Sequence, residues 1–290
     1  MVIPGKCLSF WVEILSFCMK STLPQLLVPE SAKDSASVAV AGGYAMNNGT
    51  GLSASLPYPQ GQPYRVPDLR VMIVMEGEGS LLVNLVRSDL RGGDIVVVPA
   101  GTIVEPTSIS ADFKARLLSS QTDKVEKPLL VHPEAEDREE LGQMTNIIWR
   151  ALHTEPPALD TARFQFLTFL SKVKYLAGKA PRRKSLRSEE IFQLFIEAVN
   201  TFTTQNRRIP FFAEKLGISP HHLSAVVKEA SGESAMGWIH KAAIQRAKLL
   251  LSQGMTALQV SEALEFSSAP YFNRYFKRLT GMTPGEYQKR

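Results

Sequence analysis

The chain has 290 residues, a formal net charge of +5, 44% hydrophobic residues and 21% charged residues. This length is typical of two domains of ordinary size, and the composition excludes a disordered or fibrous protein. Its two cysteines, Cys7 and Cys18, exclude a disulfide framework and a cysteine-based zinc site. They favour a reducing compartment, so we expect a cytoplasmic protein.

The charge is unevenly distributed along the chain. Residues 182–290 contain 16 Lys and Arg against 9 Asp and Glu, a net of +7, whereas residues 1–181 contain 17 against 19, a net of −2. A basic segment beside a slightly acidic one is typical of a nucleic-acid-binding domain joined to a sensor domain. An ordinary soluble basic domain would show the same charge, so this alternative stays open.

Residues 1–30 are interpreted as an N-terminal extension. The apolar stretch from Cys7 to Met19 is shorter than the roughly 20 residues that span a bilayer, and no clear signal-peptide cleavage site follows it. Three alternatives remain: a helix packed on the next domain, an export signal, or a true start at Met19 that leaves residues 1–18 outside the native protein. We expect no membrane contact.

Residues 31–130 have the pattern of a β domain. One or two strands are expected around Ser37–Met46, and short strands then follow at a spacing of about ten residues, which is typical of a small barrel or sandwich. The expected strands are Val71–Met75, Ser80–Val86, Asp94–Val98, Thr102–Pro106 and Phe113–Leu118, with turns at Glu76–Gly79 and Asp89–Gly93.

The segment Gly93–Gly101 resembles the second cupin motif, a glycine followed by five residues and Pro-x-Gly. In that motif a metal-binding histidine follows, but Val104 stands in its place here. All five histidines lie outside the expected strands, at His132, His153, His221, His222 and His240. Because metal-dependent cupin chemistry needs several imidazoles converging on one ion, we expect neither an enzyme nor a metal or other cofactor.

Three acidic residues of the β domain remain as weak alternatives for a hard cation. They are Glu76, Glu78 and Glu105. Charged residues that flank turns are usually solvated, so we expect them to be surface charges.

Residues 131–177 are predicted to form a two-helix segment, with helices over 136–153 and 159–177 separated by Glu155-Pro-Pro157. The second helix is unusually apolar, with Phe164, Phe166, Leu167, Phe169, Leu170, Val173 and Leu176. So much apolar surface needs a partner. Packing on the β domain and packing on a second copy of the chain are equally compatible with this pattern.

Residues 178–187 are polar, basic and contain a proline, which is typical of a linker. The next domain, residues 188–290, begins at Ser188, a good helix N-cap followed by Glu189 and Glu190 in the first turn.

This last domain contains one stretch twice. Ser219–Gly232 and Ser268–Gly281 match at a fixed offset of 49 residues, which indicates one supersecondary unit used twice. Each copy follows a short predicted helix and a tight turn, so we predict helix-turn-helix units at 208–232 and 256–281. A single helix over 234–252, about 27 Å long at 1.5 Å per residue, would join them. Successive major grooves lie about 34 Å apart, a distance of similar size.

Residues 188–290 resemble the DNA-binding domain of the AraC/XylS family of bacterial transcription regulators. The matching features are the two helix-turn-helix units, the connecting helix and the closing stretch Phe272–Tyr287 with its Gly-x-x-Pro-x-x-Tyr pattern. One departure is Glu265, because the family usually has glycine at this turn position.

The resemblance implies an α+β multidomain protein with a cupin-like β-barrel and a C-terminal all-α domain. Residues 31–130 would bind an unknown small-molecule effector, residues 131–177 would form a homodimer, and residues 188–290 would bind double-stranded DNA. RNA polymerase is a further candidate partner.

The resemblance also implies which residues read bases. In the first recognition helix these are His221, Ser224 and Ala225, where alanine departs from the longer polar residue that many members have. In the second they are Ala269, Pro270, Asn273 and Arg274. Arginine and asparagine can each form paired hydrogen bonds, with guanine and adenine respectively. Phe272, Tyr275 and Phe276 recur at helical spacing on the inner side, so we expect them in the core.

Candidate phosphate contacts are Lys228, Lys241, Lys248, Lys277 and Arg278, although each is equally well interpreted as a solvated charge. His240 is expected to be structural or solvent-facing. The sequence therefore predicts a dimeric, sequence-specific transcription regulator. The alternative is a low-specificity architectural DNA-binding protein without an effector response, which competitor DNA would distinguish.

Overall fold

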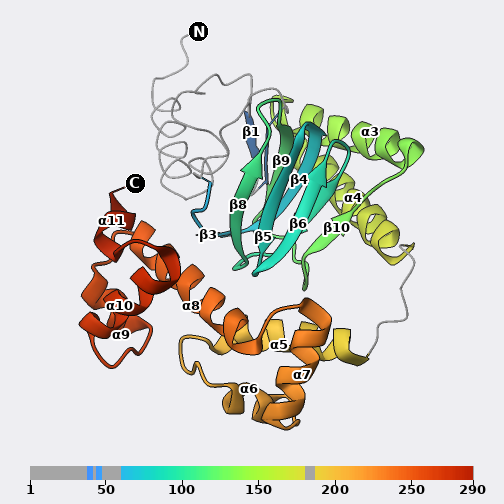
Figure 1. Cartoon of the computed structure of the whole chain (residues 1–290). Helices are drawn as coiled ribbons and strands as arrows, with labels where there is room; N and C mark the ends of the chain where they lie inside the picture. Colours follow the sequence, from blue (N-terminus) through green and yellow to red (C-terminus); the bar gives the residue numbers. More distant parts are fainter. Residues whose placement is uncertain (1–37, 42–43, 48–59, 180–186, 290) are drawn as a thin grey trace.

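The computed structural model describes residues 38–41, 44–47, 60–179 and 187–289. It shows a β-rich domain covered by two helices, followed by a purely helical domain (Figure 1). The predicted N-terminal extension and most of the predicted linker lie outside the described residues. The α+β class and the order of a β-rich part before an all-helical part are confirmed.

The β-rich domain contains two antiparallel sheets. The six-stranded sheet has the order β1 (Val38–Ala41), β2 (Tyr44–Asn47), β9 (Lys114–Ser120), β4 (Leu69–Glu76), β7 (Ile95–Val98) and β10 (Leu129–Val131). The four-stranded sheet has the order β3 (Tyr64–Arg65), β8 (Ile103–Ile109), β5 (Glu78–Val83) and β6 (Val86–Arg91). The sheets stack face to face in the described residues without closing into one barrel, an arrangement compatible with a cupin-like domain.

The central strands are apolar on both faces because the six-stranded sheet is covered on both sides. Val71 and Val97 face α3 (Ala135–Leu152) and α4 (Leu159–Lys179), while Met72 and Val96 face the four-stranded sheet. The two predicted helices are therefore present, and they pack on the β domain. Their sequence was equally compatible with packing on the β domain and on a second copy of the chain.

Over residues 187–289, which the structure describes, the C-terminal domain has seven helices: α5 (Arg187–Phe202), α6 (Ile209–Lys215), α7 (Pro220–Ser231), α8 (Ala235–Ser252), α9 (Ala257–Ala263), α10 (Ala269–Thr280) and α11 (Pro284–Gln288). Side-chain N-caps fix the starts of α7, α8, α9 and α10, whereas the predicted N-cap Ser188 is wrong, because α5 begins at Arg187 and Ser188 lies within its first turn. Ser219, Ser234, Thr256 and Ser268 each accept a hydrogen bond from the backbone N–H three residues on. Each predicted helix-turn-helix unit contains two helices joined by a tight turn, α6–α7 in the first and α9–α10 in the second.

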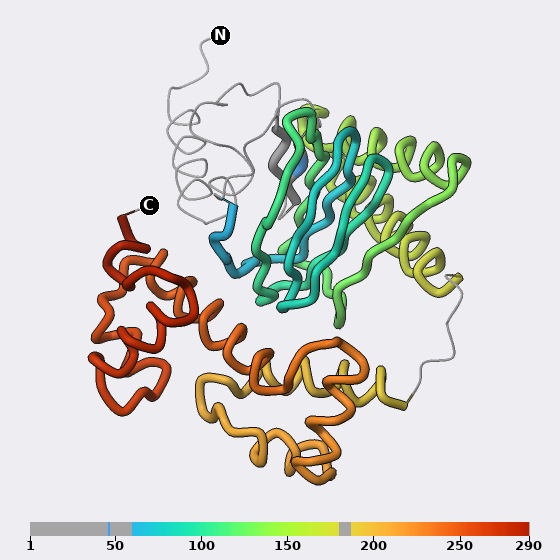
Figure 2. The backbone as a smooth tube through the Cα atoms, in the orientation of Figure 1, coloured from blue at the N-terminus to red at the C-terminus, as the bar shows by residue number. Residues whose placement is uncertain are grey.

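Each unit has a core of its own, and α8 contributes to both. Ile239 and Ala242 pack with α5, α6 and α7, whereas Ala247 and Leu251 pack with α9, α10 and α11. Figure 2 shows α8 as one continuous segment that passes from the first unit to the second. The two units are thus joined through a single helix that is packed into both cores. None of the described helices is long and apolar enough to cross a membrane.

One strand prediction is wrong, and the turn predicted over Asp89–Gly93 is shorter than expected, because β6 continues to Arg91. The expected strand Ser80–Val86 is two strands, β5 and β6, joined by a two-residue turn at Asn84 and Leu85, both of which have positive φ angles of 47° and 74°. Such a hairpin turn normally uses Asn-Gly or a similar pair, so the leucine conceals it in the sequence.

The turn between α9 and α10 explains why glycine suits position 265. Glu265 has a φ of 51°, in the left-handed region where a side chain is unfavourable. We therefore predict that Glu265→Gly raises the free energy of unfolding by about 0.5–1 kcal/mol, measured by urea denaturation. Glu262→Gly, inside α9, is the control and should lower it by about 1 kcal/mol. An unchanged or lower stability of Glu265→Gly would contradict the account of the turn.

Candidate nucleic-acid interface

The first recognition helix, α7, exposes the side chains that were predicted to read bases. Its inner side buries Leu223, Val226 and Val227, which leaves His221 and Ala225 exposed on the outer side. Ser224 is half-buried, and its hydroxyl donates a 2.8 Å hydrogen bond to the carbonyl of Pro220 in the preceding turn.

The second recognition helix, α10, has the same arrangement. Phe272, Tyr275 and Phe276 are buried, as predicted, and pack with each other and with Phe266 and Tyr287. Pro270, Asn273 and Arg274 are exposed, and Ala269 is half-buried. In the described part of the chain, no hydrogen bond or ion pair within the protein engages the Arg274 guanidinium, so it is available to a ligand.

Tyr271 is a surface residue that the sequence analysis missed. Its side chain is 47% exposed, and it lies three residues before Arg274, so the two share one side of α10. The three-residue spacing between Tyr271 and Arg274 could have predicted this exposure, but Tyr271 lies beside aromatic residues that were expected in the core.

The predicted phosphate contacts divide into three groups. Lys277 and Arg278 are exposed near the end of α10. Lys228 donates a 2.7 Å hydrogen bond to the Gly232 carbonyl at the end of α7, and Lys241 forms an ion pair with Glu233, so both already have partners within the domain.

Lys248 corrects the sequence prediction. Its Nζ lies 3.1 Å from Oε1 of Glu105, on strand β8 of the other domain, and its side chain is largely covered. Glu105, which was expected to be a solvated charge, is only 7% exposed. The structure therefore places Lys248 at the contact between domains and not among the exposed cations.

Arg207 ties the two units together at a second place. It precedes α6, yet its guanidinium donates to the carbonyls of Leu264 and Glu265, at 2.5 and 2.9 Å, in the turn of the other unit. It also stacks over the Phe266 ring at 4.2 Å. Burial lowers the pKa of Arg207, a change opposed by Tyr275 and Glu265. The left-handed turn at Glu265 is thus held by a residue outside its own unit.

A cavity of about 520 Å³ lies between the units beside Arg207, and His240 and Tyr275 line it. Burial, and secondarily the charge of Arg278, lowers the pKa of His240. Burial also raises the pKa of Tyr275 to about 12, so its hydroxyl stays protonated near neutral pH. That hydroxyl is buried and has no hydrogen-bond partner among the described residues.

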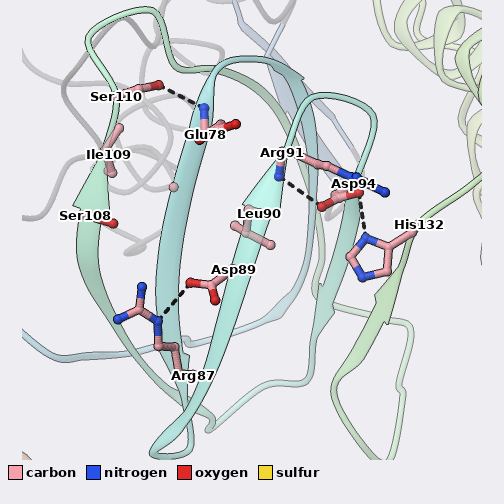
Figure 3. A pocket seen from close by; sticks show the side chains of 11 residues that line it. Glu78, Arg87, Asp89, Leu90, Arg91, Asp94, Ser108, Ile109, Ser110 and His132 are labelled. Atoms are coloured by element: carbon pink, nitrogen blue, oxygen red, sulfur yellow. Dashed lines mark hydrogen bonds and ion pairs between the residues drawn. The ribbon is translucent and has the colours of Figure 1, made fainter.

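The β-rich domain has two larger hollows of about 550 Å³ each. The first lies over β5, β6 and β8 and is lined by charged side chains (Figure 3). Its buried Asp94 lies 2.8 Å from Nδ1 of His132 and accepts a hydrogen bond from the Arg91 backbone, while Arg87 pairs with Asp89. Most of its polar groups therefore already have partners.

The second hollow lies between the two domains. Val83, Val86 and Leu130 line it from the β-rich side, and Gln193, Ile196 and Asn200 line it from α5. Its walls are more apolar than those of the first hollow, and it touches the helix that supports the first helix-turn-helix unit. In the described residues, no group of three or more His, Cys, Asp or Glu is placed to hold a metal ion.

Comparison with known proteins agrees with this geometry. The model of a helix-turn-helix domain matches residues 212–290. The arabinose operon regulatory protein of Escherichia coli is 34% identical over 84 residues, which cover 29% of each chain. An uncharacterised HTH-type transcriptional regulator of the same organism, YijO, is 24% identical over 237 residues, covering 78% of this chain and 83% of that one.

Among solved structures, ToxT from Vibrio cholerae with an unsaturated fatty acid bound matches at 18% identity and a TM-score of 0.36. The match covers 78% of this chain and 88% of ToxT.

The depressed pKa of His240 predicts a pH dependence of stability. Because the unfolded state binds a proton more readily at this residue, the free energy of unfolding should fall as the pH drops below about 6.5. His240→Gln removes this contribution. We expect wild type to lose more stability than the variant between about pH 7.5 and pH 5 in urea denaturation. Parallel losses in the two proteins would contradict the prediction.

Proposed function

We propose that the chain is a transcription regulator of the AraC/XylS type and that it binds operator DNA sequence-specifically through both helix-turn-helix units. The observation that carries this proposal is the pair of exposed recognition helices, α7 and α10, fixed at the two ends of α8. At about 1.5 Å per residue, the 18 residues of α8 give a spacer of about 27 Å, which suits recognition helices that occupy successive major grooves.

The two helices would contribute unequally to specificity. Arg274 and Asn273 on α10 have the shape and the free donors for paired hydrogen bonds to base edges. On α7, Ala225 offers only an apolar contact, for instance with a thymine methyl, and the Ser224 hydroxyl is already bonded to the backbone. We therefore propose that α10 supplies most of the direct base recognition and that α7 contributes through His221 and through its position in the groove.

The protein acts as a homodimer in this proposal. The outer side of α4 leaves Phe164 63% exposed and Tyr175 56% exposed, with Leu167 between them. Ile147 on α3 adds to this apolar surface. Exposed apolar side chains clustered on neighbouring helices support an interface with a second copy.

The effector would bind at the hollow between the domains. A ligand there would contact both the β-rich domain and α5, so its binding energy would depend on how the domains are arranged. Such differential binding is what shifts a population between two arrangements. This proposal assigns a regulatory function to the β-rich domain and no enzymatic one.

Selection from random-sequence DNA by the full-length protein at about 150 mM salt tests the function. A specific regulator should recover one sequence class with roughly 10³-fold or more preference over a scrambled duplex. Uniform recovery of all sequences would favour the architectural alternative.

Replacing Arg274 tests the assignment of base recognition. Arg274→Ala should cost about 1–3 kcal/mol on the selected duplex and relax the preference at one base pair, because a paired contact is lost. Lys277→Ala, three residues along the same helix, is the control and should weaken binding to all sequences alike. Binding isotherms on every single-base variant of the site measure both. Equal loss on every sequence for Arg274→Ala would remove it from the base-reading residues.

The dimer surface is tested by charge insertion. Phe164→Asp combined with Tyr175→Asp should convert a dimer to a monomer in sedimentation velocity, since two buried carboxylates per chain oppose association. Met75→Asp alters an apolar residue that is 45% exposed on β4 and should leave the dimer intact. A dimer that persists in the double variant would place the interface elsewhere.

A further inference from the structure

Among the described residues, the β-rich domain contacts the helical domain at two separate places. At one, the turn between β5 and β6 inserts into the helical domain, and the lower end of this hairpin points toward α5 and α8 in Figure 1. At the other, strand β8 presents Glu105 to α8. An exposed ion pair between Lys127 and Glu197, with 2.7 Å between Nζ and Oε1, lies beside the first contact.

The turn residue Leu85 belongs to the core of the other domain. Its side chain is 4% exposed and joins the apolar cluster of Phe192, Phe195 and Ile196 on α5. The Asn200 side chain of α5 donates a 3.0 Å hydrogen bond to the carbonyl of Asn84, next to this leucine. The hairpin tip therefore fits a specific socket on α5.

The backbone of this tip is unfavourable for its sequence. Asparagine tolerates the left-handed region, but a leucine with a φ of 74° does not adopt it readily. A position with this geometry would normally carry glycine. Strained residues persist where the surrounding contacts compensate for the strain, and here the compensating contact is the burial of Leu85 in the helical domain.

The second contact is a buried carboxylate. Glu105 lies 3.1 Å from Nζ of Lys248 and 3.5 Å from the side-chain amide nitrogen of Gln245, both on α8. Lys248 also donates to the Gly61 carbonyl at 3.4 Å. A carboxylate that is 7% exposed is costly without a partner, so separating the domains is opposed unless Glu105 becomes hydrated.

The two contacts lie next to the cores of different helix-turn-helix units. The cluster that receives Leu85 includes Leu223 and Val227 of the first recognition helix. Lys248 lies in the second half of α8, next to Ala247, which belongs to the core of the second unit. The β-rich domain therefore bridges the two units.

We infer that the hairpin tip at Leu85 and the carboxylate of Glu105 form a docking surface that braces both helix-turn-helix units in the orientation used to bind DNA. This inference rests on the proposed function. Docking leaves the outer sides of α7 and α10 open, with His221, Ala225, Asn273 and Arg274 all exposed in the docked chain. Because docking already fixes the orientation of both units and leaves the recognition helices accessible, less conformational entropy is lost on DNA binding. The affinity for DNA is therefore higher.

The test compares full-length variants at the two contacts. Leu85→Gly removes the side chain that fills the socket and relieves the backbone, so loss of binding cannot be attributed to a destabilised hairpin. Asn84→Asp is its control, because it alters the same turn while keeping Leu85, the carbonyl that Asn200 binds and the side-chain oxygen that accepts from the Ile103 backbone N–H. Glu105→Gln removes the charge that faces Lys248. Its control is Glu76→Gln, which removes an exposed partner of Lys114.

Two quantities are measured for each variant: hydrogen exchange in α5 and α8, and affinity for both the duplex selected by wild type and a scrambled duplex. We expect faster exchange and at least about 5-fold weaker binding to the selected duplex for Leu85→Gly and Glu105→Gln. Binding to the scrambled duplex should be unchanged, because phosphate contacts dominate it. The two control variants should resemble wild type in both measurements.

Unchanged exchange in both test variants would overturn the docking surface. Faster exchange with equal or tighter binding to the selected duplex would overturn the brace, since docking would then hold a resting state. If the wild-type protein selects no DNA sequence, both the proposed function and the brace are wrong. Hydrogen exchange would still show, independently of DNA, whether the hairpin docks on the helical domain.

Discussion

The structure depends on one helix that is shared by two hydrophobic cores. α8 buries Ile239 and Ala242 in the first unit and Ala247 and Leu251 in the second. Because an α-helix of 18 residues is stiff, each core fixes the direction of the other through it. The clamp of Arg207 on the turn at Glu265 closes the same pair of units from a second side. The spacing of the recognition helices follows from these contacts.

In the proposed function, the β-rich domain controls how the two units are arranged. Its two stacked sheets and its covering helices have hydrophobic cores of their own, one on each face of the six-stranded sheet. It reaches the helical domain through Leu85 and Glu105. The hollow next to Leu85 is bounded by both domains, so an effector bound there would act where the docking contacts lie. In the proposed function, sensing and DNA recognition would be linked through these adjacent side chains.

Local sequence signals predicted most of this fold. The repeat offset and the glycines that end its two copies, Gly232 and Gly281, located both recognition helices, because a glycine that ends a helix acts on the backbone beside it. The turn at Asn84 and Leu85 was missed because the leucine has a positive φ, which its residue type disfavours. Its side chain is instead buried in the helical domain, which is distant in the sequence. Lys248 was misassigned because its partner, Glu105, lies in the other domain, and no residue near Lys248 in the sequence indicates this contact.

The central claim is that both units bind DNA in a register fixed by α8. Inserting about five base pairs, half a helical turn, between the two contacted grooves of the selected duplex tests it most directly. The account predicts that affinity falls to that of scrambled DNA, roughly 10³-fold, because a rigid α8 cannot follow the rotated groove. Retained affinity would show that the units bind independently and would contradict the account.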